Sequence, residues 1–138
     1  MGDSGLIVLD THALLWWVSG DSQLSRRALE AVERELQADD GEILVSAISA
    51  WEIALLVDKG WLSLSMSIDD WLDTVQEIDG VHFVAVDPAT AVASTRLPGE
   101  FHKDPADRMI VALTRRFNAE LVTADEKMTA YRHVRTIW

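Results

Sequence analysis

Short apolar runs alternate with segments of helical periodicity along most of this chain. The first run, Leu6–Leu9, is typical of a strand buried on both faces, and a helical segment begins directly after it at Asp10-Thr11. Such alternation is typical of repeated βα units, in which helices join parallel strands. The chain therefore predicts an α/β fold with a mostly parallel sheet. The other expected strands are residues 42–45, 81–86, 120–123 and 134–137.

Capping signals mark the expected helices. Ser25 and Ser46 are suitable N-cap residues, and Gly60 is suited to end the helix that begins after Ser46. Asp87-Pro88 and Asp104-Pro105 each combine an N-cap residue with a proline at the first helical position. Helices are expected over residues 13–18, after Ser25, over 46–59, 68–78 and 87–96, after Asp104, and over 124–131. Side chains assigned to packing include Leu36, Trp51, Trp71 and Phe117.

The length and composition favour one packed domain over residues 1–138. The chain has 138 residues, of which 49% are hydrophobic, enough to build a globular core. No apolar run approaches the roughly 20 residues of a membrane span, so no membrane association is expected. Cysteine is absent from the sequence, which excludes disulfides, zinc–thiolate sites and a cysteine nucleophile. These features fit a cytoplasmic protein.

The charge balance is strongly acidic. The chain has 12 lysines and arginines against 23 aspartates and glutamates, which gives a formal net charge of −11. Proteins that bind nucleic acids usually carry a basic surface, so this balance alone opposes such a role. Bound cations or a basic partner would be needed to compensate the excess of carboxylates.

Five of these acids are expected to meet at one edge of the sheet. Asp10 follows the first strand directly, and Asp125 follows the fourth strand by two residues. Glu52 lies near the start of the helix after the second strand, and Asp104 and Asp107 lie in the first turn of a later helix. In a parallel sheet, all strand-to-helix junctions share the edge where ligands bind. We therefore expect these carboxylates to converge.

A convergent carboxylate cluster favours a divalent cation. Carboxylates a few Å apart repel one another and raise each other's pKa, so they need a counter-charge to remain ionised. All-oxygen ligands suit Mg²⁺ or Mn²⁺, which keep several bound waters and often contact phosphates. Such an ion can activate a water for attack on phosphorus. The cluster therefore indicates a phosphodiester hydrolase without a protein nucleophile.

Each of these acids also has a structural alternative. Asp10, Asp104 and Asp125 can all serve as N-caps, and Asp87 is interpreted as a plain N-cap at a similar junction. Spacing alone therefore does not separate a metal ligand from a cap. The neighbouring residues His12, His102, Lys103 and Arg108 have two interpretations as well, contact with substrate or phosphate, or an ordinary surface role.

Four sequence blocks, taken in order, resemble the PIN-domain family, and in particular its VapC-type toxins of toxin–antitoxin pairs. The blocks span most of the chain, and each is weak alone while the ordered set is specific. They are Leu9-Asp10-Thr11-His12-Ala13-Leu14-Leu15-Trp16, Ser46-Ala47-Ile48-Ser49-Ala50-Trp51-Glu52-Ile53, His102-Lys103-Asp104-Pro105-Ala106-Asp107-Arg108-Met109-Ile110-Val111-Ala112 and Leu121-Val122-Thr123-Ala124-Asp125.

The resemblance implies a three-layer sandwich around a five-stranded sheet of order 3-2-1-4-5. It also implies Mg²⁺- or Mn²⁺-dependent cleavage of RNA, often tRNA, a homodimer, and inhibition by a cognate antitoxin. By motif position, the catalytic acidic quartet is Asp10, Glu52, Asp107 and Asp125. The metal ligands implied are Asp10, Asp107 and Asp125, with Asp104 as an accessory acid, while Thr11 and Thr123 match small hydroxyl positions that orient ligands or water.

Two other classes of function stay open at this stage. An acidic-pocket phosphatase of the haloacid type would need a second aspartate two residues after Asp10, and His12 stands there. A receiver-type site would need paired acids beside the first strand and a lysine after the fifth, and the sequence has neither. The remaining alternative is a PIN-like module that binds RNA or protein without catalysis.

Overall fold

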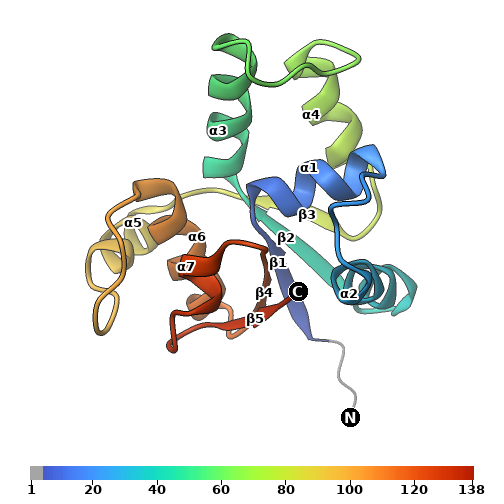
Figure 1. The fold of residues 1–138 in the computed structure, drawn as a ribbon. Helices are drawn as coiled ribbons and strands as arrows, with labels where there is room; N and C mark the ends of the chain where they lie inside the picture. The colour runs from blue at the N-terminus through green and yellow to red at the C-terminus, as the bar shows by residue number, and fades with distance from the viewer. Residues whose placement is uncertain (1–4) are drawn as a thin grey trace.

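The computed structural model describes residues 5–138, and it has one sheet at its centre (Figure 1). Five strands pair in the order β3-β2-β1-β4-β5, and every pairing is parallel. This confirms the expected α/β class and strand order. The boundary of a single domain at 1–138 stays a prediction, since residues 1–4 lie outside the described part. The strands are β1 (Leu6–Leu9), β2 (Glu42–Ser46), β3 (Val81–Val84), β4 (Glu120–Val122) and β5 (Arg135–Ile137).

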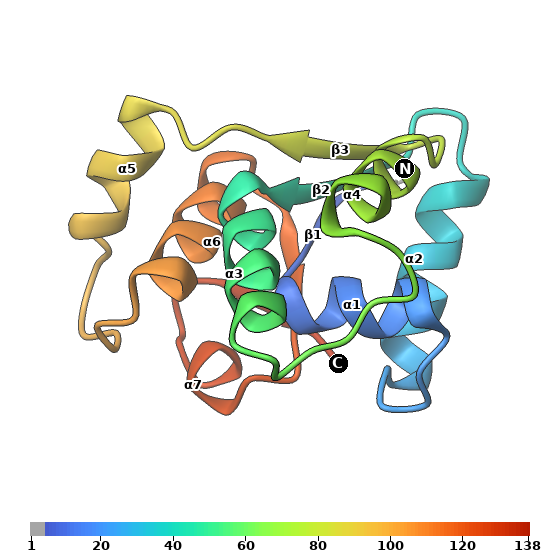
Figure 2. The same cartoon turned by 90° about the horizontal axis from the view of Figure 1, so that it is seen from above.

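Seven helices connect these strands within the described residues and cover the sheet (Figure 2). No helix among residues 5–138 is long and apolar enough to cross a membrane. The helices are α1 (Thr11–Ser19), α2 (Arg26–Gln37), α3 (Ala47–Asp58), α4 (Ile68–Gln76), α5 (Pro88–Thr95), α6 (Pro105–Arg116) and α7 (Glu126–Thr129).

The alternation of side chains along β1 divides the core into two layers. Ile7 and Leu9 face one side of the sheet, where they pack with buried residues of α1, α2, α3 and α4. Val8 faces the other side and packs with Ile110 and Leu113 of α6. The side chains of Ile7, Val8, Leu9, Ile110 and Leu113 are at most 1% exposed. A strand buried on both faces accounts for the uninterrupted apolar run in the sequence.

The strand-to-helix junctions show how the sequence sets the functional edge. Asp10 ends the β1 segment and caps α1, and Ser46 is both the last residue of β2 and the N-cap of α3. Because the strands are parallel, these junctions lie at the same edge of the sheet. The central strands β1 and β4, where the direction of chain progression across the sheet reverses, are adjacent.

Several local expectations were wrong. β3 ends at Val84 rather than residue 86, because its partner β2 ends opposite it and offers no further pairing. The last helix spans four residues rather than 124–131. Trp51 is 54% exposed, since α3 buries only Ser49 and Ile53, and Leu36 and Phe117 are 40% and 41% exposed. The latter two side chains lie at the ends of their helices, beyond the reach of the core.

Candidate active site

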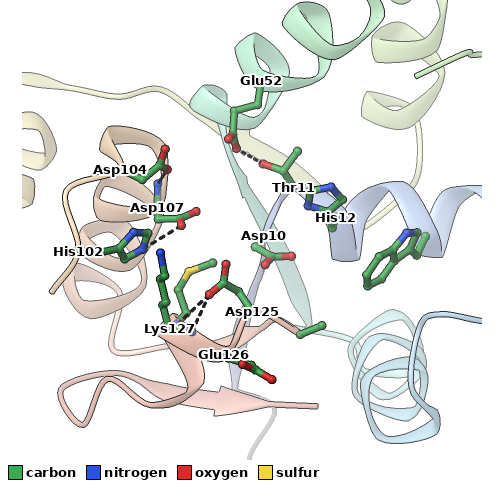
Figure 3. Close-up of a pocket in the computed structure, with 13 residues that line it drawn as sticks. Asp10, Thr11, His12, Glu52, His102, Asp104, Asp107, Asp125, Glu126 and Lys127 are labelled. Atoms are coloured by element: carbon green, nitrogen blue, oxygen red, sulfur yellow. Dashed lines mark hydrogen bonds and ion pairs between the residues drawn. The ribbon is translucent and has the colours of Figure 1, made fainter. Parts of the chain in front are cut away.

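Six carboxylates line one hollow at the edge where β1 and β4 end (Figure 3). The hollow has a volume of about 680 Å³. It brings together all five acids that the sequence singled out, although they come from four separate helices and their caps. The acids are Asp10, Glu52, Asp104, Asp107 and Asp125. The other lining residues include Thr11, His12, Trp16, His102, Glu126, Lys127 and Met128.

Asp10 is the most buried acid of the site, at 5% exposed. One carboxylate oxygen caps α1 by accepting the Ala13 N–H at 2.9 Å, and the other accepts the Thr123 hydroxyl at 2.5 Å. Burial raises the pKa of Asp10 above its ordinary value, and the bonds from Thr123 and Ala13 offset this in part. The carboxylate is therefore fixed in position, and its ionised form is disfavoured unless a positive charge is near.

Glu52 approaches from the second turn of α3. The Thr11 hydroxyl, at the start of α1, donates to one of its oxygens at 2.5 Å, and the Ser49 hydroxyl lies 2.8 Å from Thr11 Oγ1. Burial raises the pKa of Glu52, and the charge of Asp104 raises it further. The Thr11 hydroxyl thus orients the Glu52 carboxylate, whose proton affinity is higher than that of an exposed glutamate.

The pKa of Asp107 is raised to about 7. Burial is the largest cause, and the charges of the other site carboxylates, with Asp104 first among them, raise the pKa as well. The sequence places the pair together, because Asp104 caps α6 by accepting the Asp107 N–H at 2.9 Å. His102 Nε2 lies 3.0 Å from Asp107 Oδ2, although at an angle that leaves Nε2 without a satisfied hydrogen bond.

Asp125 completes the ring of acids from the start of α7. One of its oxygens accepts the backbone N–H groups of Lys127 and Met128, at 2.7 and 3.2 Å. Its own N–H donates to the Thr123 hydroxyl at 3.0 Å. Thr123 therefore connects Asp125 to Asp10 and sets the spacing of the two acids that follow the adjacent strands β1 and β4.

The capping alternative is confirmed, but it does not compete with a role in the site. Asp10, Asp104 and Asp125 each cap a helix in the structure. In the described chain, Asp104 Oδ1 and Asp125 Oδ2 make no hydrogen bond, so each cap leaves one carboxylate oxygen available. Capping fixes the orientation of these carboxylates without using up their acceptors.

The cation closest in sequence to the acids does not neutralise them. Arg108 turns away from the hollow and donates to three backbone carbonyls, those of Ser94 at 2.8 Å, Phe101 at 3.0 Å and His102 at 3.2 Å. This arrangement ties down the loop before α6, and the phosphate contact considered for Arg108 stays a prediction. Lys103 is exposed and does not line the hollow.

The donor set of the hollow fits a hard divalent cation. The candidate ligands Asp10, Asp104, Asp107 and Asp125 are all carboxylates. Burial, followed by the charges of the neighbouring acids, raises the pKa of Asp107. Within residues 5–138, no three acid or histidine side chains converge closely enough to form a complete coordination group. The acids instead surround the hollow, which suits an ion such as Mg²⁺ that keeps several of its waters.

Five residues of the hollow were not among the sequence candidates for the site: Trp16, Ala124, Glu126, Lys127 and Met128. Glu126 and Lys127 follow Asp125 in the first turn of α7, and their adjacency to Asp125 was the available signal. Trp16 belongs to the first of the four sequence blocks and also lines the hollow. Its ring lies 5.6 Å from that of His12 and 5.7 Å from that of Trp138.

The chain is similar to known proteins over nearly its whole length. Over 134 residues it is 35% identical to Ribonuclease VapC22 of Mycobacterium tuberculosis, covering 96% of this chain and 98% of that protein. Its fold resembles a chain in the crystal structure of VapBC2 from Rickettsia felis bound to a DNA fragment from their promoter, with a TM-score of 0.69, 15% identity and coverage of 95% and 96%.

A toxin–antitoxin complex from Klebsiella pneumoniae gives a similar match, with a TM-score of 0.63, 19% identity and coverage of 93% and 94%. At such low identity, these two structures support the fold alone. The model of the PIN domain matches residues 7–134, which include every acid that lines the hollow. The chain belongs to the PIN-domain family.

Proposed function

We propose that this protein is a metal-dependent endoribonuclease that acts as the toxin of a toxin–antitoxin pair. The observation that carries the proposal is the meeting of six carboxylates in one hollow without a compensating arginine. The similarity to a ribonuclease over 96% of the chain supports RNA as the substrate.

Asp10, Asp107 and Asp125 would hold Mg²⁺ or Mn²⁺, with Asp104 as the accessory acid. When bound, such an ion supplies positive charge for phosphoryl oxygens and lowers the pKa of water. The contribution of the chain is to fix these carboxylates before any ligand arrives. Thr123 does this for Asp10, and the α6 and α7 caps do it for Asp104 and Asp125.

Glu52 would handle the proton of the attacking water, while Asp107, whose pKa is also raised, would hold the ion. The raised pKa of Glu52 makes it a stronger base than an exposed glutamate, and Thr11 holds its orientation. Asp125, on the other side of the hollow, would share in positioning the water. In hydrolysis, the water oxygen bonds to phosphorus, one phosphodiester P–O bond breaks, and the water proton passes to Glu52.

Two protein partners follow from the same proposal. The solved complexes of similar fold, described as VapBC2 and as a toxin–antitoxin complex, support a cognate antitoxin as a partner of this chain. The toxin would act in the cytoplasm, with RNA, including tRNA, as its target. Exposed tryptophans support contact with further protein, since Trp51 is 54% and Trp61 is 75% exposed. A homodimer is the form proposed for the free toxin.

The test is cleavage of RNA by the purified protein with Mg²⁺, with Mn²⁺ and with EDTA. We expect cleavage with either metal and none with EDTA. Asp10→Asn and Asp107→Asn are expected to lower the rate by roughly 100-fold or more, since they remove ligand charge. Asp87→Asn is the matched control, because it changes an aspartate N-cap outside the hollow in the same way.

Other outcomes would contradict the proposal in distinct ways. Cleavage that survives both Asp10→Asn and Asp107→Asn would remove the acids from the reaction. RNA binding without cleavage under all metal conditions would favour a binding module. Release of phosphate from a phosphomonoester, with RNA left intact, would favour the phosphatase alternative.

A further inference from the structure

The positive charges of this acidic chain are concentrated in its last third. Residues 96–135 contain eight of the 12 lysines and arginines but only six of the 23 acids. Four of those six acids line the carboxylate hollow. Residues 5–95 contain four basic and 16 acidic residues. The net charge of −11 therefore hides a basic region around α6, α7 and β5, which lie together on one side of the molecule (Figure 1).

Two further hollows continue from the carboxylate hollow across this region. His102 and Lys127 line both the carboxylate hollow and a second hollow of about 580 Å³. Arg132 and His133 line both the second hollow and a third of about 420 Å³. The three hollows are therefore neighbours, and Lys127 points into the first of them from α7 (Figure 3).

The third hollow is strongly basic. Arg115, Arg132 and Arg135 line it together with His133, and no acid of the described chain does. Glu100 is the one acid that lines the second hollow among residues 5–138. We name Lys127, Arg132, Arg115 and Arg135 the basic track.

The four cations of the basic track form no ion pair with a carboxylate of residues 5–138. No carboxylate of residues 5–138 lies within 4.0 Å of their charged groups, since the ion pairs there involve other residues. Arg115 donates to the His133 carbonyl at 2.5 Å, and Arg135 donates to the Asn118 carbonyl at 2.7 Å. These bonds hold the guanidinium groups in place while leaving their positive charge uncompensated.

Aromatic rings accompany the cations in the second hollow. Phe101, Tyr131 and His133 line it, with centroids 4.7 Å apart for Phe101 and Tyr131 and 5.3 Å apart for Tyr131 and His133. Tyr131 is buried, so Phe101 and His133 are the partly exposed rings of this series. A positively charged groove combined with aromatic rings is the usual construction of a surface for single-stranded nucleic acid, where phosphates meet cations and bases meet rings.

We propose that the basic track binds the phosphate backbone of single-stranded RNA and leads it into the carboxylate hollow. The proposal rests on the proposed nuclease function for its direction, because the track begins at the hollow where cleavage would occur. It also explains how a protein of net charge −11 holds RNA, since the acids of this region are concentrated where a divalent cation would compensate them.

An acidic protein segment is the competing occupant of such a surface. The observations favour RNA because the track adjoins the acidic hollow where cleavage of a phosphodiester would occur. The partly exposed rings of Phe101 and His133 in the second hollow further suit bases rather than aspartate and glutamate side chains.

The test is the binding of a fluorescent single-stranded RNA of roughly ten nucleotides, followed by anisotropy in EDTA over a series of salt concentrations. The double variant Lys127→Gln/Arg132→Gln is the main probe, because neither side chain makes a hydrogen bond within residues 5–138 that the fold would lose. We expect affinity to fall by roughly threefold to tenfold, and the salt dependence to decrease by about 0.7 per cation removed. The matched control is Arg26→Gln/Arg27→Gln, which removes two exposed cations from the first turn of α2.

The outcomes separate this inference from the proposed function. Binding and salt dependence equal to wild type in Lys127→Gln/Arg132→Gln, in a protein whose wild type cleaves RNA with Mg²⁺ or Mn²⁺, would overturn the track and leave the nuclease intact. Weakened binding in that variant alone, in a protein that cleaves with neither metal, would support the track and overturn the nuclease. Equal weakening in the Arg26/Arg27 control, or a poly-glutamate peptide that binds as tightly as RNA, would overturn the track.

Discussion

Asp10 and Asp87 occupy equivalent local positions but differ in almost every physical property. Each is an aspartate that follows a strand and caps the next helix, and each accepts a backbone N–H three residues later. Asp87 is exposed and pairs with Arg116 at 2.9 Å, and its bonds to Thr90 and Arg116 lower its pKa. Asp10 is buried among other carboxylates, and its pKa is raised.

The difference comes from the surroundings and not from the local sequence. Beside Asp87, an arginine from α6 supplies the opposite charge. Beside Asp107, the adjacent Arg108 is engaged by three backbone carbonyls and supplies none. A capped carboxylate with a counter-charge is explained by structure alone, whereas a group of carboxylates without an ion pair to lysine or arginine favours a bound cation.

The larger of the two expected effects is that of Asp107 on the pH dependence of the free energy of unfolding. The folded-state pKa of Asp107 is about 7 against an ordinary value of 3.8. Its protonated form therefore stabilises the metal-free fold fully below pH ~4, and this contribution is lost as the pH rises towards 7. Between pH 5 and 8 we expect a loss of about 1–2 kcal/mol in the free energy of unfolding, after allowance for solvent screening.

Thermal or urea unfolding of the metal-free protein at pH 5, 6, 7 and 8 measures this effect. The free energy of unfolding of Asp107→Asn is expected to change less with pH than that of wild type. Added Mg²⁺ or Mn²⁺ is expected to restore the stability of the wild-type protein at pH 8. An identical pH profile in wild type and Asp107→Asn would contradict the interpretation of the site as uncompensated.

The smaller expected effect is at Asp87. Its pKa is lowered, so its pairing with Arg116 stabilises the fold above the ordinary aspartate pKa and loses that contribution as the pH falls through the folded-state value. Because the pair is exposed, Arg116→Gln is expected to lower the melting temperature only slightly at pH 7 and not at all at pH 3. RNA cleavage should be unchanged, and a large loss of activity would show that the two regions are coupled.

The fold was largely predictable because its local signals agree with its packing. The apolar run of Leu6–Leu9 reflects burial on both faces of β1, and the caps at Ser25, Ser46 and Asp104 fix three helix starts. The errors at Trp51 and Phe117 arose where a large apolar side chain lies outside the core, which hydrophobicity alone does not reveal.

The site was predictable in membership but not in its electrostatics. Parallel topology implies that Asp10 and Asp125 share an edge, and the predicted helix starts add Glu52, Asp104 and Asp107. The orientation of Arg108 towards carbonyls depends on the loop path before α6, which no spacing rule gives. The basic track likewise depends on how α7 and β5 are placed beside the C-terminal end of α6.

Calorimetric titration with Mn²⁺ tests the central claim most directly, because it measures the ligand that the uncompensated acids require. Asparagine caps helices about as well as aspartate, so Asp10→Asn and Asp87→Asn each remove one charge while keeping the cap. We expect wild type and Asp87→Asn to bind Mn²⁺ alike, and Asp10→Asn to bind at least about tenfold more weakly. Equal binding by wild type and Asp10→Asn, or equal losses in both variants, would contradict a metal site in this hollow.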